Sequence, residues 1–350
     1  MRVLVTGASG FLGGAVAADL VGAGHEVRTL QRRPSGVAGA DDILGSVTDP
    51  DAAAHALDGV EGVIHLAAKV SLAGDPRDFE AVNVGGTRTI LDAAERAGVS
   101  RFVFISSPSV AHAGTALAGV GAEPASPEHA RGDYARTKAK AELLALSRDS
   151  AEMAVVAIRP HLVWGPGDPQ LVERIVARAR AGRLPLLNGG TALIDSTYID
   201  NAATGITAAL ARDDDAHGRA FVLTNGEPRA VGELLAGICL AAGVRPPRWS
   251  VPAGLARAAG SVVERIWAVR PGEDEPPMTR FLAEQLSTAH WFDQRGTREA
   301  LGWAPAVSID EGLARLAAHE RANAAGRSSP SDRRRRRGNG GPPQAALPRV

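Results

Sequence analysis

The sequence is poor in cysteine, lysine and tyrosine. Its single cysteine, Cys239, cannot form an intrachain disulfide, and no group of cysteine and histidine residues has the spacing of a metal site. No apolar run approaches the roughly 20 residues that cross a bilayer. The opening Met-Arg-Val-Leu-Val-Thr is strand-like and unlike an apolar leader. These absences argue against disulfide-stabilised, metal-binding and membrane-spanning proteins, and they predict a cytoplasmic protein.

The formal net charge of the chain is zero, but the positive and negative residues are unevenly distributed along it. From Ala324 onward seven arginines and one aspartate give +6, so the preceding residues carry −6. An acidic body argues against nucleic acid as a partner. Residues 324–350 are rich in Gly, Pro, Ser and Arg, which predicts a disordered tail. The run Arg333–Arg337 could attract anionic lipid or nucleic acid, but a solubilising tail is favoured.

The first half of the chain alternates short β-branched runs with longer helical stretches. This alternation predicts an α/β fold with a Rossmann-type, doubly wound parallel sheet. The dinucleotide-binding domain is expected over residues 1–165 and is rejoined by about 199–225. A smaller, discontinuous C-terminal substrate domain is expected over 166–198 and 226–320. The expected strands are Arg2–Thr6, Glu26–Leu30, Gly62–Leu66, Arg101–Ser106 and Met153–Arg159, with helices beginning near Phe11, Asp49, Asp78 and Tyr134.

A glycine-rich segment, TGASGFLGG, follows the first expected strand. Gly7, Gly10 and Gly13 have the spacing G-x-x-G-x-x-G, and Phe11 and Leu12 begin the next helix. Glycines let the backbone turn tightly and approach a pyrophosphate, whose charge then lies at a helix N-terminus. These five residues are therefore predicted to bind a dinucleotide, although a plain strand–helix turn would have a similar sequence.

The end of the second expected strand bears on the choice of cofactor. An NAD site usually has an acidic residue here for the ribose 2′-hydroxyl. This chain instead reads Leu30-Gln31-Arg32-Arg33. Two guanidinium groups can pair with a 2′-phosphate, so Arg32 and Arg33 favour NADP(H). NAD(H) stays open, because both arginines could simply face solvent.

Tyrosine and lysine are scarce, yet one of each stands in the stretch GDYARTKAKAE. The chain has two tyrosines and three lysines, and Lys138 follows Tyr134 by four residues in a helix-forming sequence. Residues at i and i+4 share one helix face, so a phenol and an ammonium could meet one ligand. The alternative is a surface pair on a solvated helix.

Six motifs in a fixed order resemble the extended short-chain dehydrogenase/reductases, the NAD-dependent epimerase/dehydratase superfamily. Besides the glycine loop and the Tyr/Lys pair they are VIHLAA (Val63–Ala68), NVGGT (Asn83–Thr87), FISSPSV (Phe104–Val110) and RPHLVWGPGD (Arg159–Asp168). Within that superfamily the chain is most similar to the 3β-hydroxysteroid dehydrogenase branch. That branch includes sterol-4α-carboxylate 3-dehydrogenases and 2-alkyl-3-oxoalkanoate reductases.

The resemblance assigns roles by matching position. It implies that Tyr134 is the catalytic acid/base, that Lys138 binds the nicotinamide ribose, and that Ser107 holds the substrate oxygen, with Ser106 as the fallback. It implies a homodimer formed through a helix pair that includes the Tyr134 helix. Trp164 stands where many relatives have tyrosine and suggests an apolar wall near the substrate. Further positions expected to line the cofactor, or else to be turn and core residues, are Ala67, Asn83, Pro160 and His161.

The substrate is expected to be apolar. Nucleotide-sugar enzymes of the superfamily typically carry an arginine where this chain has Ile194-Asp195-Ser196. Val251–Val269 has helical apolar spacing and could cover a lipid pocket, touch a membrane surface or face the core. The prediction is an NAD(P)-dependent dehydrogenase/reductase that interconverts 3-oxo and 3-hydroxy groups on a lipid, 2-alkyl-3-oxo acid or steroid-like molecule. The alternatives are a nucleotide-sugar epimerase/dehydratase and a non-catalytic NADP-binding sensor.

Overall fold

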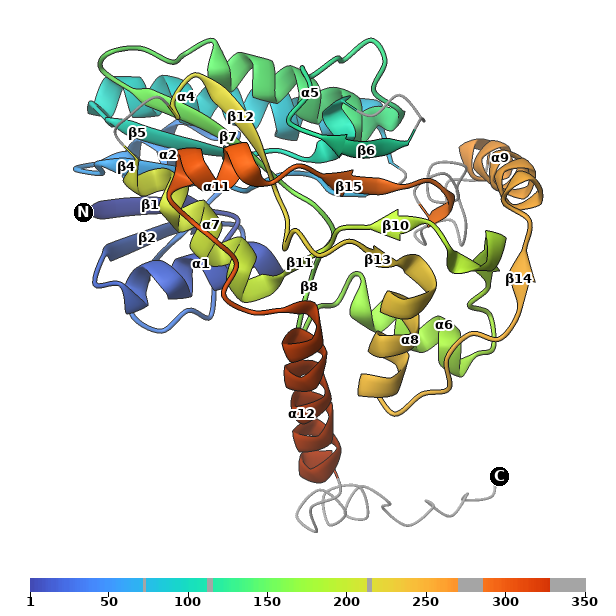
Figure 1. Ribbon diagram of the computed structural model, residues 1–350. Coiled ribbons are helices and arrows are strands. Elements are labelled where there is room, and N and C mark those ends of the chain that lie inside the picture. Colours follow the sequence, from blue (N-terminus) through green and yellow to red (C-terminus); the bar gives the residue numbers. More distant parts are fainter. Residues whose placement is uncertain (72–73, 112–115, 213–215, 270–285, 328–350) are drawn as a thin grey trace, which may run out of the picture.

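Seven parallel strands form the central sheet of the protein (Figure 1). The computed structural model describes residues 1–71, 74–111, 116–212, 216–269 and 286–327. The strand order is β12-β7-β5-β4-β1-β2-β3, and each neighbouring pair is parallel. Because all neighbouring strands are parallel, the carboxyl ends of all seven strands lie at one edge of the sheet. The strands are β1 Arg2–Thr6, β2 Glu26–Gln31, β3 Asp41–Leu44, β4 Gly62–His65, β5 Arg101–Ile105, β7 Ala154–Pro160 and β12 Arg219–Leu223.

Helices cover both faces of this sheet because its inner strands are apolar on both sides. Helices α1 (Phe11–Gly22) and α7 (Ile199–Ala211) share one hydrophobic cluster with β1, β5, β7 and β12. Helices α2 (Pro50–Leu57), α4 (Gly86–Ala97) and α5 (Gly132–Leu146) enclose the other face. The predicted doubly wound Rossmann-type fold is confirmed.

A second part of the molecule lies beside the carboxyl edge of the sheet (Figure 1). It contains a four-stranded sheet in the order β13-β10-β15-β6 and the helices α6, α8 and α12. The strands are β13 Arg229–Ala230, β10 Leu193–Ile194, β15 His290–Phe292 and β6 Leu117–Val120, and the helices are α6 Val172–Arg180, α8 Val231–Ala241 and α12 Ile309–Arg327. The remaining elements are α3 Pro76–Phe79, η1 Glu80–Gly85, η2 Pro108–Ala111, β8 Val163–Trp164, β9 Leu186–Leu187, η3 Asn188–Gly190, β11 Thr197–Tyr198, β14 Ser250–Val251, α9 Ala253–Val269 and α11 Arg295–Leu301.

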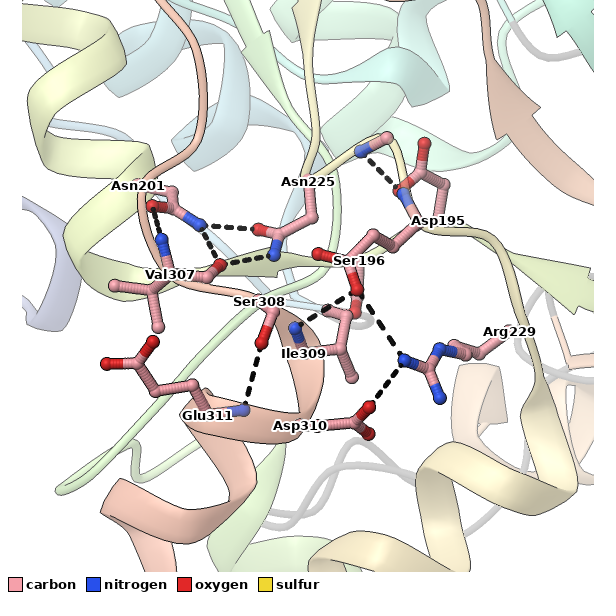
Figure 2. A network of polar contacts seen from close by, with 12 residues as sticks. Asp195, Ser196, Asn201, Asn225, Arg229, Val307, Ser308, Ile309, Asp310 and Glu311 are labelled. Atoms are coloured by element: carbon pink, nitrogen blue, oxygen red, sulfur yellow. Dashed lines mark hydrogen bonds and ion pairs between the residues drawn. The ribbon is translucent and has the colours of Figure 1, made fainter.

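Buried asparagines join the two parts (Figure 2). Asn201 on α7 donates to the carbonyl oxygen of Val307 (2.7 Å) and to the side-chain oxygen of Asn225 (2.9 Å), which follows β12. Asn225 in turn donates to Val307 (2.8 Å). The chain leading into α12 is therefore tied to the sheet by hydrogen bonds that water cannot reach.

Neither β3 nor the short strands outside the central sheet were predicted from the sequence, and some helical features were misplaced. β3 has exposed acidic residues at its start, so it lacks the apolar alternation that marks a strand. Helix α12 continues to Arg327, so residues 324–327 are helical; the rest of the predicted tail, 328–350, lies outside the described residues. In α9, Leu255 is 65% exposed while Ala253 and Ala256 are buried, so Leu255 does not face the core. The side chains of residues 261–262 and 264–269 lie outside the described part. Within the described ranges, every helix is too short or too polar to cross a bilayer.

Candidate active site

The glycine loop between β1 and α1 is built for close approach of a ligand. Gly7 has φ 77°, in the left-handed region that favours glycine, and its N–H donates to Leu30 (3.1 Å). A Cβ on Gly13 would lie 2.4 Å from the Gly7 carbonyl oxygen, so only glycine fits there. Gly10 caps α1 without a side chain, and the first turn carries no acidic residue. The open N-terminus of α1 can therefore receive an anionic group.

Other predicted residues lie at the carboxyl ends of neighbouring strands. Ala67 follows β4, packs against Gly7 and donates its N–H to the Thr6 hydroxyl (3.1 Å). Pro160 ends β7, and the buried His161 shares a hydrogen bond (2.7 Å) between its Nδ1 and the carbonyl oxygen of Asp195. Phe11 and Leu12 are partly buried and pack against the hydrophobic cluster of the second part. The parallel topology therefore brings these residues to one edge.

Asn83 has an internal role in this structure. Its side chain accepts from the Lys69 N–H (2.7 Å), donates to the Lys69 carbonyl (3.3 Å) and donates to the Thr137 hydroxyl (3.0 Å). Thr137 lies on α5 between Tyr134 and Lys138. Asn83 thus fixes the segment after β4 against the helix that carries the predicted acid/base.

The end of β2 carries a feature that the sequence did not reveal. Arg32 and Arg33 are exposed. The buried Gln31 donates from its amide to the Thr29 hydroxyl (2.8 Å) and to the carboxylate of Asp42 (3.2 Å). Asp42 belongs to the missed strand β3, so an acidic residue does stand beside the end of β2, brought there by the fold.

Tyr134 and Ser107 lie together, as the resemblance implied. Ser107 follows β5, and its side chain hydrogen-bonds with the phenol of Tyr134. Burial raises the pKa of Tyr134 to about 12, and the bond to Ser107 opposes the rise. The Ser107 oxygen also accepts from the Ser109 hydroxyl (2.9 Å). The neighbouring Ser106 is buried with a hydroxyl that has no partner in the described structure, so Ser107 is the serine placed beside the phenol.

Lys138 is buried one helical turn after Tyr134. Its ammonium donates to the carbonyl oxygen of Ile105 at the end of β5 and lies 4.0 Å from the centre of the Phe104 ring. Burial lowers the pKa of Lys138 to about 7, and the charge of Glu142 opposes the fall. A lysine with a pKa close to neutral pH can gain or lose its proton when its surroundings change slightly.

His65 completes the buried polar group under the sheet edge. Its ring is bonded to the Thr6 hydroxyl (2.8 Å) and to the Thr87 hydroxyl (3.1 Å). Burial and the nearby charge of Lys138 lower the pKa of His65 to about 3, so the ring is neutral at pH 7. His65 lies inside the VIHLAA motif, but no role was predicted for it from the sequence, because a single histidine inside a strand looks like a core residue.

The interpretation of Trp164 as a substrate wall is wrong. Its side chain has no exposed surface and lies in the core of the second part, with its ring edge-on to Tyr198 at 5.5 Å between centroids. Its indole N–H donates to the Ser196 hydroxyl (3.0 Å). A buried tryptophan with a satisfied N–H is a structural residue. Among the described residues, no cluster of His, Cys, Asp or Glu could hold a metal ion.

The fold and the glycine loop are those of a dinucleotide-binding protein of the short-chain dehydrogenase/reductase type. Residues 3–224 match the NAD dependent epimerase/dehydratase family, and the chain belongs to that family. Its relatives are named as reductases and dehydrogenases, so the protein is an NAD(P)-dependent oxidoreductase. The predicted family and enzyme class are confirmed.

Individual proteins show which members of the family the chain resembles. The chain is 41% identical over 326 residues to the 2-alkyl-3-oxoalkanoate reductase of Stenotrophomonas maltophilia, which covers 91% of this chain and 99% of that protein. It is 32% identical to a 3 beta-hydroxysteroid dehydrogenase/Delta 5-->4-isomerase of Mycobacterium tuberculosis, with 89% and 88% covered. A solved short-chain dehydrogenase/reductase superfamily protein from Agrobacterium tumefaciens with bound NAD has a TM-score of 0.70 at 26% identity, with 93% and 99% covered.

Proposed function

We propose that the protein interconverts a 3-oxo and a 3-hydroxy group on a bulky apolar substrate, with Tyr134 as the acid/base. The observation that carries this proposal is the hydrogen bond between Tyr134 and Ser107, with Lys138 one turn away, at the sheet edge that also holds the glycine loop. The substrate class is supported by the names of the relatives in Stenotrophomonas and Mycobacterium.

The protonation states suit ketone reduction. With a pKa of about 12, Tyr134 carries its proton at pH 7 and can donate it to an oxygen that gains negative charge. Ser107 hydrogen-bonds the same oxygen and holds it beside the phenol. A bound nicotinamide dinucleotide supplies the hydride. A charged Lys138 favours the phenolate that remains after proton transfer and can donate to a ribose hydroxyl.

The glycine loop, the exposed Arg32 and Arg33 and the sheet edge fit a dinucleotide, and we infer that NADP(H) is the preferred form. Each arginine can donate charge-assisted hydrogen bonds to a 2′-phosphate, worth about 1.5–3 kcal/mol per bond. Replacing Arg32 and Arg33 together by alanine is expected to reduce kcat/KM for NADPH at least tenfold and to leave that for NADH nearly unchanged. The exposed Arg248→Ala is the control, and an equal loss with both cofactors would contradict NADP(H) selectivity.

The nucleotide-sugar alternative lacks support from the residues that would bind a diphosphate. Ile194 is only 3% exposed, and the carboxylate of Asp195 accepts from the Thr224 hydroxyl (2.7 Å) and from the N–H of Gly226 (3.0 Å). This position offers no cation to a charged sugar nucleotide.

The deciding experiment incubates purified protein and NADPH with 2-alkyl-3-oxo acids, 3-oxosteroids and UDP-sugars. Turnover of an oxo acid or an oxosteroid is expected, and turnover of the sugars alone would refute the proposal. Tyr134→Phe, which keeps the ring, should lower kcat at least 100-fold while the Kd for NADPH changes little. A sensor that does not turn over substrate would keep its cofactor-dependent behaviour in this variant.

A further inference from the structure

A buried ion pair lies behind the proposed active site. Glu142 on α5 and Arg159 on β7 have side chains only 1% and 2% exposed. The guanidinium contacts both carboxylate oxygens, with Nε to Oε2 at 2.9 Å and Nη2 to Oε1 at 2.5 Å. Arg159 also donates to the carbonyl oxygen of Glu123 at 2.6 Å. Both charged groups are therefore held in one fixed geometry.

Stability alone does not account for such a pair. Removing two charges from water costs several kcal/mol per ion, and replacing a buried pair by apolar residues is often neutral or stabilising. A surface ion pair such as Lys140–Glu80 avoids this cost. The position of Glu142 in the fold suggests what the buried charge does.

Glu142 shares a helix face with the catalytic pair. It follows Lys138 by four residues and Tyr134 by eight, so the three side chains lie one above the other along α5. Lys138 is only 3% exposed, and its ammonium is enclosed by the Phe104 ring and the carbonyl of Ile105. Glu142 lies one turn further along the same helix face, and its negative charge acts on this ammonium.

The other titratable groups near Lys138 do not supply that charge. His65 on β4 is neutral at pH 7, and Tyr134 on α5 keeps its proton. Arg159 on β7 is a cation and opposes a charged lysine. Glu142 is thus the anion that acts on Lys138, and Arg159 holds its carboxylate in place through contacts with both oxygens.

We propose that Glu142, fixed by Arg159, is a positioning residue that keeps the buried Lys138 ammonium charged beneath Tyr134. Its consequence for turnover rests on the proposed function, whereas its effect on the charge of Lys138 does not. The pair thereby links β7, which leads into Pro160 and His161, to the helix that carries the acid/base.

The scarcity of lysine makes a direct test practical. Protein labelled with ¹³C at lysine Cε gives signals from only three lysines, which Lys69→Arg and Lys140→Arg assign. The pH titration of the Lys138 signal is compared in the wild type, in Glu142→Gln and in Glu142→Leu/Arg159→Met. The double variant removes both charges, so it retains the fold even where the single variant leaves Arg159 unpaired. Glu80→Gln, which removes the surface partner of Lys140, is the matched control.

The midpoint of the Lys138 titration is expected to fall by about 1 pH unit or more in Glu142→Gln, and by a smaller amount in the double variant, which also loses the opposing charge of Arg159. It should stay unchanged in Glu80→Gln and in the charge-conserving Glu142→Asp. An unchanged Lys138 midpoint in both Glu142→Gln and the double variant would overturn the proposal. In the activity arm, the pH profile of kcat/KM should shift with the lysine midpoint. A wild type without turnover but with the lysine shift would refute the proposed function and leave this inference standing.

Discussion

Four ionisable side chains near the carboxyl edge of the sheet reach different protonation states through their surroundings. His65 is neutral, with its pKa lowered to about 3, and Tyr134 is protonated, with its pKa raised to about 12. Burial moves both toward the uncharged form. The pKa of Lys138 falls to about 7, and that of Asp195 rises to about 6, so these two titrate close to neutrality. The pH dependence of the protein near neutrality should therefore depend on Lys138 and Asp195.

Asp195 gives a prediction on stability. Burial raises its pKa from 3.8 to about 6, while hydrogen bonds from Thr224, Glu227 and Gly226 oppose the rise. The folded state therefore binds more protons than the unfolded state between about pH 4 and pH 6, so this group stabilises the fold at low pH and loses that contribution as pH rises. Asp195→Asn should remove this dependence. The wild-type free energy of unfolding relative to the variant should fall by about 2 kcal/mol from pH 4 to pH 7.

Urea unfolding of both proteins at several pH values measures this difference. Comparing the two proteins cancels the contributions of His65 and of the surface carboxylates. A difference that stays constant across pH 4 to 7 would mean that the buried carboxylate titrates equally in the folded and unfolded states.

At the scale of elements, helix α1 offers a test of the cofactor site with a control in the same helix. Gly13→Val places a side chain against the Gly7 carbonyl, so the loop must open, and the Kd for NADPH should rise at least tenfold. Gly22 lies at the other end of α1 with no atom within 4 Å of an added Cβ. Gly22→Ala should leave the Kd unchanged and stabilise the helix slightly. Fluorescence titration of NADPH measures both, and equal Kd values would show that the loop does not hold the cofactor.

Elements with a clear apolar periodicity or glycine spacing could be predicted from the sequence. Elements that depend on pairing with a neighbouring strand could not. β1 was predicted with the bounds that the structure has, because its apolar pattern is uninterrupted. Strand β3 was missed because its sequence has no apolar alternation, and it is held in place by parallel pairing with β2. The same reasoning applies to the site. Tyr134 and Ser107 were found through local motifs, whereas Glu142 and Arg159 look like ordinary charged residues until the fold brings them together.

At the scale of the whole molecule, the sheet and the second part are joined by few but buried polar contacts (Figure 2). The Asn201 side-chain oxygen accepts from the N–H of Ala306 and of Val307, at 2.9 and 3.0 Å. Asn225 accepts from the N–H of Tyr198 at 3.0 Å, beside the Trp164 ring. The two asparagines thus satisfy backbone groups from β11 and from the segment before α12. The orientation of the second part over the proposed site depends on them.

Asn225→Ala should weaken the contact between the sheet and the second part, although it removes only a small side chain. It leaves the buried Tyr198 N–H without an acceptor and removes a donor from Val307, which together should lower the free energy of unfolding by about 2–4 kcal/mol. Asn323 on α12 is an exposed asparagine bonded only to His319 among the described contacts, so Asn323→Ala is the matched control and should cost less than about 0.5 kcal/mol. Because Asn225 lies between the sheet and the second part, its loss should also raise KM for the substrate more than the Kd for NADPH. Urea unfolding and steady-state kinetics measure both effects, and equal stability losses in the two variants would mean that the asparagine network does not hold the parts together.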